Sequence, residues 1–79
     1  MSRAKYVRLQ NDDIIIFSQG KNHSDFEYMN PKTAGFIQIY AEDDQPRCAC
    51  FGKSDSLGLE SDEKRDTKYA NSQLFRSEW

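Results

Sequence analysis

The chain has 79 residues, of which 37% are hydrophobic and 30% are charged, and its formal net charge is −2. A chain of this length forms one domain with a thin core, and the lack of excess positive charge disfavours general nucleic-acid binding. The longest apolar run, Ile14–Phe17, is too short for a membrane span or a signal-peptide core. We therefore expect a single cytoplasmic domain, 1–79, with no membrane association.

Four segments rich in β-branched and aromatic residues predict β-strands. The first two, at about 4–9 and 13–18, flank a polar turn cluster and form a hairpin. A short strand at 26–29 is an additional option, which Pro31 would end. The clearest strand, at about 36–41, returns through a polar turn into a strand at about 47–51. The pattern is typical of a four-stranded antiparallel meander.

The composition changes after Gly52, where a polar linker precedes a segment without Gly or Pro. This segment predicts a helix at about 62–75, with Ser61 as its N-cap and the acidic residues of its first turn favoured by the helix dipole. Its apolar stripe is narrow, so we expect the helix to lie on one face or at the edge of the sheet. The expected fold class is α+β, a four-stranded antiparallel β-meander with one C-terminal α-helix.

Alternation along the strands divides their side chains between two faces of the sheet. One set is apolar and suits the face that the helix covers: Val7, Leu9, Ile37 and Ile39. The other set mixes aromatic and polar side chains and is the candidate interaction surface: Tyr6, Arg8, Phe36, Gln38 and Tyr40. The alternative is that loops and the 26–29 segment cover this second face.

The short motifs in the sequence lack residues that their chemistry requires. The segment 52–54 (Gly-Lys-Ser) resembles the end of a phosphate-binding loop, but Arg47 stands where the loop needs its first glycine. Cys48 and Cys50 supply two metal ligands where zinc needs four, and His23 is the only histidine. We expect two reduced, buried cysteines, a solvated loop histidine, no metal site and no cofactor.

The segment 52–61 (GKSDSLGLES), preceded by Gly-Phe-Ile at 35–37, resembles a group of small uncharacterised bacterial proteins. Those proteins have a strand led by Gly-Phe, then a Gly-x-Ser-x-Ser-Leu-Gly-Leu segment, then an acidic helix. The resemblance implies a bacterial source and a setting in mobile or accessory DNA, but no activity. In physical terms, Gly58 supplies a backbone angle that other residues resist.

Three functions fit these observations. The first is a non-enzymatic interaction protein that binds a protein partner or a second copy of itself through a sheet face or edge. The second is binding of single-stranded nucleic acid on the aromatic face, with Arg3, Lys5 and Arg8 meeting phosphates, which the net charge disfavours. The third, and the least supported, is an enzyme that pairs a cysteine with His23.

Overall fold

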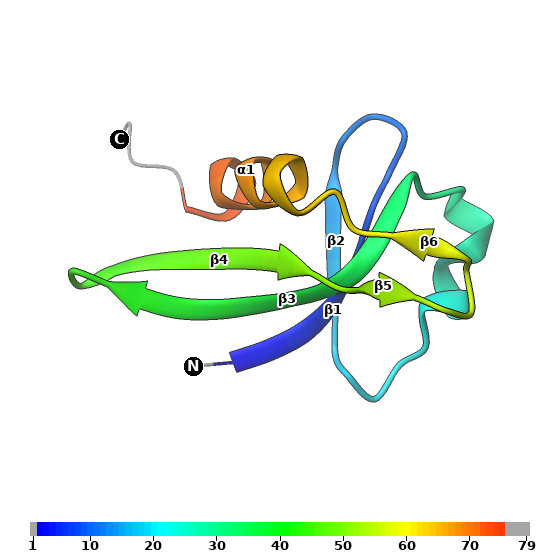
Figure 1. Ribbon diagram of the computed structural model, residues 1–79, viewed down its shortest axis with the longest axis horizontal. Helices are drawn as coiled ribbons and strands as arrows, with labels where there is room; N and C mark the ends of the chain where they lie inside the picture. Colours follow the sequence, from blue (N-terminus) through cyan, green and yellow to red (C-terminus); the bar gives the residue numbers. More distant parts are fainter. Residues whose placement is uncertain (1, 76–79) are drawn as a thin grey trace.

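The computed structural model describes residues 2–75, which form a four-stranded antiparallel sheet, a two-stranded sheet, a 3-10 helix and an α-helix (Figure 1). The elements in chain order are β1 (Ser2–Arg8), β2 (Ile14–Phe17), η1 (His23–Met29), β3 (Thr33–Glu42), β4 (Gln45–Phe51), β5 (Lys53–Ser54), β6 (Leu59–Glu60) and α1 (Glu63–Leu74). The expected α+β class, with a four-stranded antiparallel sheet and one C-terminal α-helix, is confirmed.

The strand order differs from that of a simple meander. The four strands lie in the order β2-β1-β3-β4, so β3 pairs with β1 and not with β2. The connection from β2 to β3 is long and contains η1, which packs against β1. A long connection can cross a neighbouring strand, whereas a tight hairpin can only place the next strand alongside the last. The strand β1 therefore lies inside the sheet, and β2 and β4 form its edges.

The expected strand at 26–29 is instead part of η1. Local capping explains the difference, because the Asp25 carboxylate accepts a hydrogen bond from the Asn22 N–H at 3.2 Å. The turn ends at Asn30, whose φ of 53° is left-handed and whose N–H donates to the Glu27 carbonyl. These polar residues at both ends outweigh the β-propensity of the aromatic residues between them.

A two-residue turn fixes how β3 and β4 pair. Glu42 pairs with Gln45, and the residues between them, Asp43 and Asp44, have φ values of 52° and 64°. Positive φ at both central positions is the requirement of a type I′ hairpin turn, whose twist matches that of the flanking strands. The turn thereby determines the register of every residue pair between the two strands.

The residues after Gly52 form more structure than the expected linker. The strands β5 and β6 make a small hairpin, and Gly58 in its turn has a φ of 66°, which confirms the expected need for glycine there. The helix α1 starts one residue later than predicted, because Asp62 accepts from the Arg65 N–H and is the N-cap. The predicted cap, Ser61, instead donates its hydroxyl to the Gly52 carbonyl at 2.7 Å.

The helix α1 is bonded to both edges of the sheet. Asn71 accepts from the Cys48 N–H and donates to the Cys48 carbonyl, both at 3.0 Å, on β4. Gln73 makes the same pair of bonds with Ile14 of β2, at 2.9 and 2.8 Å. Because β2 and β4 are opposite edges, the sheet must curl around the helix; Figure 1 shows β2 at a steep angle to β3 and β4. We call the face towards α1 the inner face and the opposite one the outer face.

Two apolar clusters lie on opposite sides of the sheet. The inner cluster contains Tyr6, Ile14, Ile37, Cys48, Cys50 and Ala70. The outer cluster contains Val7, Phe17 and Ala34, and Phe26 from η1 and Leu57 and Leu59 from the β5–β6 hairpin pack against it. The prediction that Val7 and Leu9 face the helix with Ile37 is therefore wrong, since both belong to the outer side.

Candidate functional site

The five residues predicted as one interaction surface lie on two faces. Tyr6 and Arg8 are on the inner face, with exposures of 0% and 4%. The other three are on the outer face and are half-buried: Phe36, Gln38 and Tyr40. The register is the reason, because Tyr6 pairs with Gly35 and not with Phe36, and paired residues point to the same side of a sheet. The predicted grouping is corrected accordingly.

The same register brings other residues beside the three that remain. Three cross-strand rows lie next to one another on the outer face: Lys5-Phe36-Phe51, Arg3-Gln38-Ala49 and Tyr40-Arg47. We call these eight residues the outer patch. Arg3 is exposed and the other seven are half-buried. On the inner face of the same strands, Ile37, Cys48 and Cys50 are at most 2% exposed, so the patch is the solvent-facing side of β3 and β4.

Aromatic rings and a guanidinium group lie in contact in this patch. The rings of Phe36 and Phe51 are stacked at an interplanar angle of 30°, with their centroids 6.0 Å apart. The Arg3 guanidinium carbon lies 5.3 Å from the Phe51 centroid, within the range of a cation–π interaction. These contacts hold flat apolar surfaces and a cation together at one place.

The charge of the outer patch is opposite to that of the whole chain. Three of its eight residues are basic and none is acidic: Arg3, Lys5 and Arg47. The first acid along the same face is Glu42, in the next row at the hairpin tip. The net charge of −2 therefore arises elsewhere, and it does not describe the electrostatic field over the patch.

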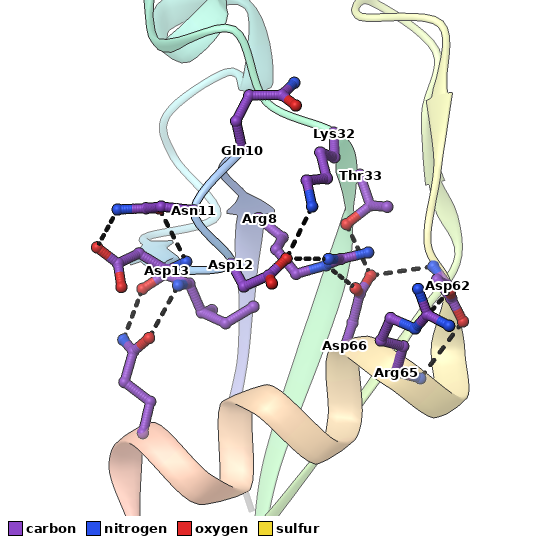
Figure 2. Close-up of polar contacts among 12 residues, drawn as sticks. Arg8, Gln10, Asn11, Asp12, Asp13, Lys32, Thr33, Asp62, Arg65 and Asp66 are labelled. Carbon is purple, nitrogen blue, oxygen red and sulfur yellow. Dashed lines mark hydrogen bonds and ion pairs between the residues drawn. The ribbon is translucent and has the colours of Figure 1, made fainter.

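A second polar site lies on the inner face, where α1 meets the sheet (Figure 2). Asp66 of α1 is fully buried and accepts hydrogen bonds from Arg8 Nε at 2.5 Å and from Thr33 Oγ1 at 2.8 Å. The Tyr6 hydroxyl and the Asp62 N–H donate to the same carboxylate. Burial, and next the hydrogen bond to Asp66, raise the pKa of Tyr6 far above its ordinary value, so the phenol stays protonated and remains a donor.

The solvent-exposed end of this inner-face cluster is Asp12. Its Oδ1 lies 2.5 Å from Arg8 Nη1 and 2.9 Å from Lys32 Nζ; Figure 2 marks both contacts with dashed lines. The hydrogen bond from Lys32, together with that from Arg8, lowers the pKa of Asp12 although partial desolvation opposes the shift. Burial acts to lower the pKa of Arg8, but its bonds to Asp66 and Asp12 raise it. Each group thus stays charged around neutral pH.

This buried polar cluster has the properties of a structural element that holds α1 on the sheet. Within the part of the chain that the structure describes, no buried side-chain nitrogen or oxygen lacks a hydrogen-bond partner. Asp66 alone receives four donors, from β1, β3 and the N-cap residue of α1. A carboxylate whose lone pairs are occupied in this way stabilises the fold and has little capacity left for a ligand.

The cysteines and the histidine are not brought together. Cys48 and Cys50 are buried on the inner face, as expected, and burial raises the pKa of Cys48 to about 11 and that of Cys50 to about 12. His23 lies on the outer side, where it packs edge-on against Phe36. It is 5% exposed, with Nε2 2.8 Å from the Gly35 carbonyl. The prediction of a solvated loop histidine is wrong, and the sheet separates His23 from both thiols.

Residues 2–75 offer neither a candidate metal cluster nor a candidate membrane-spanning helix. No group of three or more His, Cys, Asp or Glu side chains in that range is placed to hold a metal ion. No helix in the range has the length and apolar character needed to cross a membrane. At 52–54, Gly52 has a φ of 78° in the turn that leads into β5, and a two-stranded hairpin follows where a phosphate-binding loop would open a helix.

Comparisons with known protein families, with curated proteins and with solved structures find no match to this chain. The resemblance to small bacterial proteins therefore stays a prediction.

The patch residues that the sequence did not predict differ in whether a local sequence signal could have revealed them. The turn at 43–44 pairs Arg47 with Tyr40, Ala49 with Gln38 and Phe51 with Phe36, so three members of the patch follow from recognising a two-residue hairpin. The addition of Arg3 and Lys5 depends on the pairing of β1 with β3, which no local turn determines.

Proposed function

We propose that this protein is a non-enzymatic interaction protein that binds its partner through the outer patch. The observation that carries the proposal is the contrast between the two faces of β3 and β4. On the inner face, Ile37, Cys48 and Cys50 are buried beneath α1, whereas the outer face leaves aromatic rings and basic side chains half-exposed beside one another. Tyr, Phe and Arg are the residue types enriched where proteins bind partners.

Binding is favoured over catalysis by the condition of the reactive groups. Both thiols are buried with raised pKa values, which lowers the fraction of nucleophilic thiolate. The only histidine lies across the sheet from them and is packed against aromatic rings. The buried Asp66 is occupied by four donors. The outer patch, in contrast, has surface that a partner can cover.

The chemistry of the patch favours an anionic partner. Three cations with no acid among them attract negative charge, and the rings add apolar area whose burial stabilises a complex. A protein partner would meet these requirements with an acidic, partly apolar segment. A second copy of the chain is the other form of the proposal, since its own acidic turn at 42–44 is exposed.

An NMR titration of the full chain tests the proposal. The probes are an acidic peptide, a single-stranded oligonucleotide and, for self-association, a dilution series. We expect at least one of the three to shift the backbone amides of the outer patch while those of the inner face stay in place. Arg47→Glu should abolish the response, and Lys64→Glu on the exposed side of α1 is the control with the same charge change. No movement of the patch under any probe would overturn the proposal, as would equal loss in both variants.

A further inference from the structure

We infer that the occupant of the outer patch is single-stranded nucleic acid. The inference rests on the proposed function and names its partner class. Its basis is the placement of three aromatic rings, each accompanied by a cation, on the half-exposed face of an antiparallel sheet. Proteins that bind single strands combine aromatic platforms, on which bases stack, with positive charge that follows the phosphates.

The rings form two platforms at opposite ends of the patch. Phe36 and Phe51 stack on each other in one row, and Tyr40 lies two rows away on the same strand and the same face. Four residues of extended strand span about 13 Å, so the platforms are far enough apart for separate bases. A chain of a few nucleotides, lying along β3, can place one base on each platform.

Each platform has a positive charge beside it. Lys5 is the cross-strand neighbour of Phe36, and Arg47 is the cross-strand neighbour of Tyr40. Arg3 lies over the Phe51 ring with its guanidinium carbon 5.3 Å from the centroid. A base stacked on either platform would therefore have its phosphate next to a basic side chain. Stacked arginine also presents a planar cation of its own to a base.

Three acids at the tip of the β3–β4 hairpin lie at one end of this surface and limit its extent. Glu42, Asp43 and Asp44 occupy the hairpin tip beyond Tyr40, and their charge repels a strand that continues past the patch. The patch has three basic residues and no acid although the chain has a net charge of −2, so it can attract an anion that the chain as a whole would not. This arrangement also predicts a short site and modest affinity.

Single strands fit the patch better than the two other anionic partners. In a duplex the base faces are stacked on one another and unavailable to the rings. An acidic protein segment would satisfy the cations, but its carboxylates do not stack on the rings, whereas every nucleotide brings both a base that can stack and a phosphate that a cation can meet. The observations therefore favour exposed bases, and the acidic segment becomes an outcome of the test.

The test measures binding of the full chain by fluorescence anisotropy and NMR at low salt. The probes are a labelled single-stranded oligonucleotide of about ten nucleotides, an abasic oligonucleotide of the same length, the matching duplex and an acidic peptide. We expect the single strand to bind at least about tenfold more tightly than the abasic strand, because one lost stacking contact has an effect of about that size. Tyr40→Ala should weaken binding by a similar factor.

The salt dependence separates the role of the cations from that of the rings. Three phosphate contacts to a single strand give a slope of about −2 for log K against log salt. Arg47→Ala should reduce that slope by about 0.7, whereas Tyr40→Ala should leave it unchanged. Lys64→Ala on α1 is the matched control, which should alter neither affinity nor slope. Unchanged amide shifts far from the substitution, in α1 for the patch variants and in β2 for Lys64→Ala, establish that each variant is folded.

The outcomes distinguish this inference from the proposed function. Equal binding of abasic and base-bearing strands would overturn the inference, because the rings would then contribute nothing. A response of the patch to the acidic peptide or to self-association alone would overturn it too, while leaving the interaction function in place. If neither the probes nor dilution shift the backbone amides of the outer patch, both the inference and the proposed function are overturned.

Discussion

Replacement of Asp66 tests whether the buried cluster holds α1 on the sheet. Asp66→Ala leaves the guanidinium of Arg8, which is 4% exposed, without its partner on α1. Loss of one member of a buried ion pair costs about 3–5 kcal/mol, and the lower end applies here because Arg8 keeps its bond to Asp12. The free energy of unfolding of a domain this small is about 4–12 kcal/mol. The substitution therefore removes a large fraction of the stability.

Asp66→Asn gives a finer measure, because it preserves shape and changes only hydrogen-bonding capacity. Of the four donors on the carboxylate, the hydroxyls of Tyr6 and Thr33 can rotate and accept from the new amide, but Arg8 Nε and the Asp62 N–H cannot. These two N–H groups lie on different carboxylate oxygens, so either orientation of the amide leaves one without an acceptor. A buried unsatisfied donor costs about 1–3 kcal/mol.

The assay is urea unfolding followed by circular dichroism, with the midpoint compared at constant m-value. Asp55→Asn is the control, since that carboxylate is 90% exposed and should change stability by less than about 0.5 kcal/mol. Replacing Arg8 and Asp66 together by Met and Leu should cost less than the sum of the two single changes. If Asp66→Asn lowers the free energy of unfolding no more than the control does, or if the effects of the two single changes simply add in the double variant, the cluster does not hold α1 on the sheet.

Three further results are expected. Iodoacetamide at about pH 8 should label Cys48 and Cys50 at least about 100-fold more slowly in the folded chain than in urea. Burial raises the pKa of these thiols from 9.0 to about 11 or higher, which lowers the thiolate fraction by that factor. Equal labelling rates in the folded and unfolded chain would contradict the burial. Asp12→Asn should lower the urea midpoint near neutral pH and have no effect in strong acid. Because the pKa of Asp12 is depressed in the folded state, its contribution is present above the ordinary value of 3.8 and is lost as the pH falls below it; a pH-independent difference would refute this. Replacing Asp43-Asp44 by Asn-Gly should stabilise the chain by about 1 kcal/mol, since glycine adopts positive φ without steric cost; a lower midpoint would show that the turn is not type I′.

The sequence predicted those parts of the fold that depend on local chemistry. Strand-forming segments, polar turns and the helix are properties of neighbouring residues, and all four large strands were located to within a few residues. The pairing of β1 with β3 depends on residues about 30 positions apart, and a shift of one residue exchanges the faces. For that reason Tyr6 and Arg8 were assigned to the surface although both are buried.

The burial of Asp66 has a sequence signal, its helical spacing from Ala70, that is hard to interpret. Asp66 and Ala70 are four residues apart and therefore share one helix face, and both are buried. A charged residue that lies on the apolar face of a helix is normally expected to be solvent-exposed. Its burial depends on Arg8, 58 residues away. His23 is a similar case, because its polar neighbours predict a solvated loop while its ring is enclosed by Phe17 and Phe36.

The bonds from α1 to both edge strands have a consequence for aggregation. An uncovered strand edge is a template on which another chain can pair. From α1, Asn71 bonds to the backbone N–H and carbonyl of Cys48 on β4, and Gln73 bonds to those of Ile14 on β2. Detachment of this one helix therefore uncovers two opposite edges at the same moment, and a partly opened molecule could recruit neighbours on either side. The two side-chain amides that hold the helix in place thus also protect both strand edges from pairing with another chain.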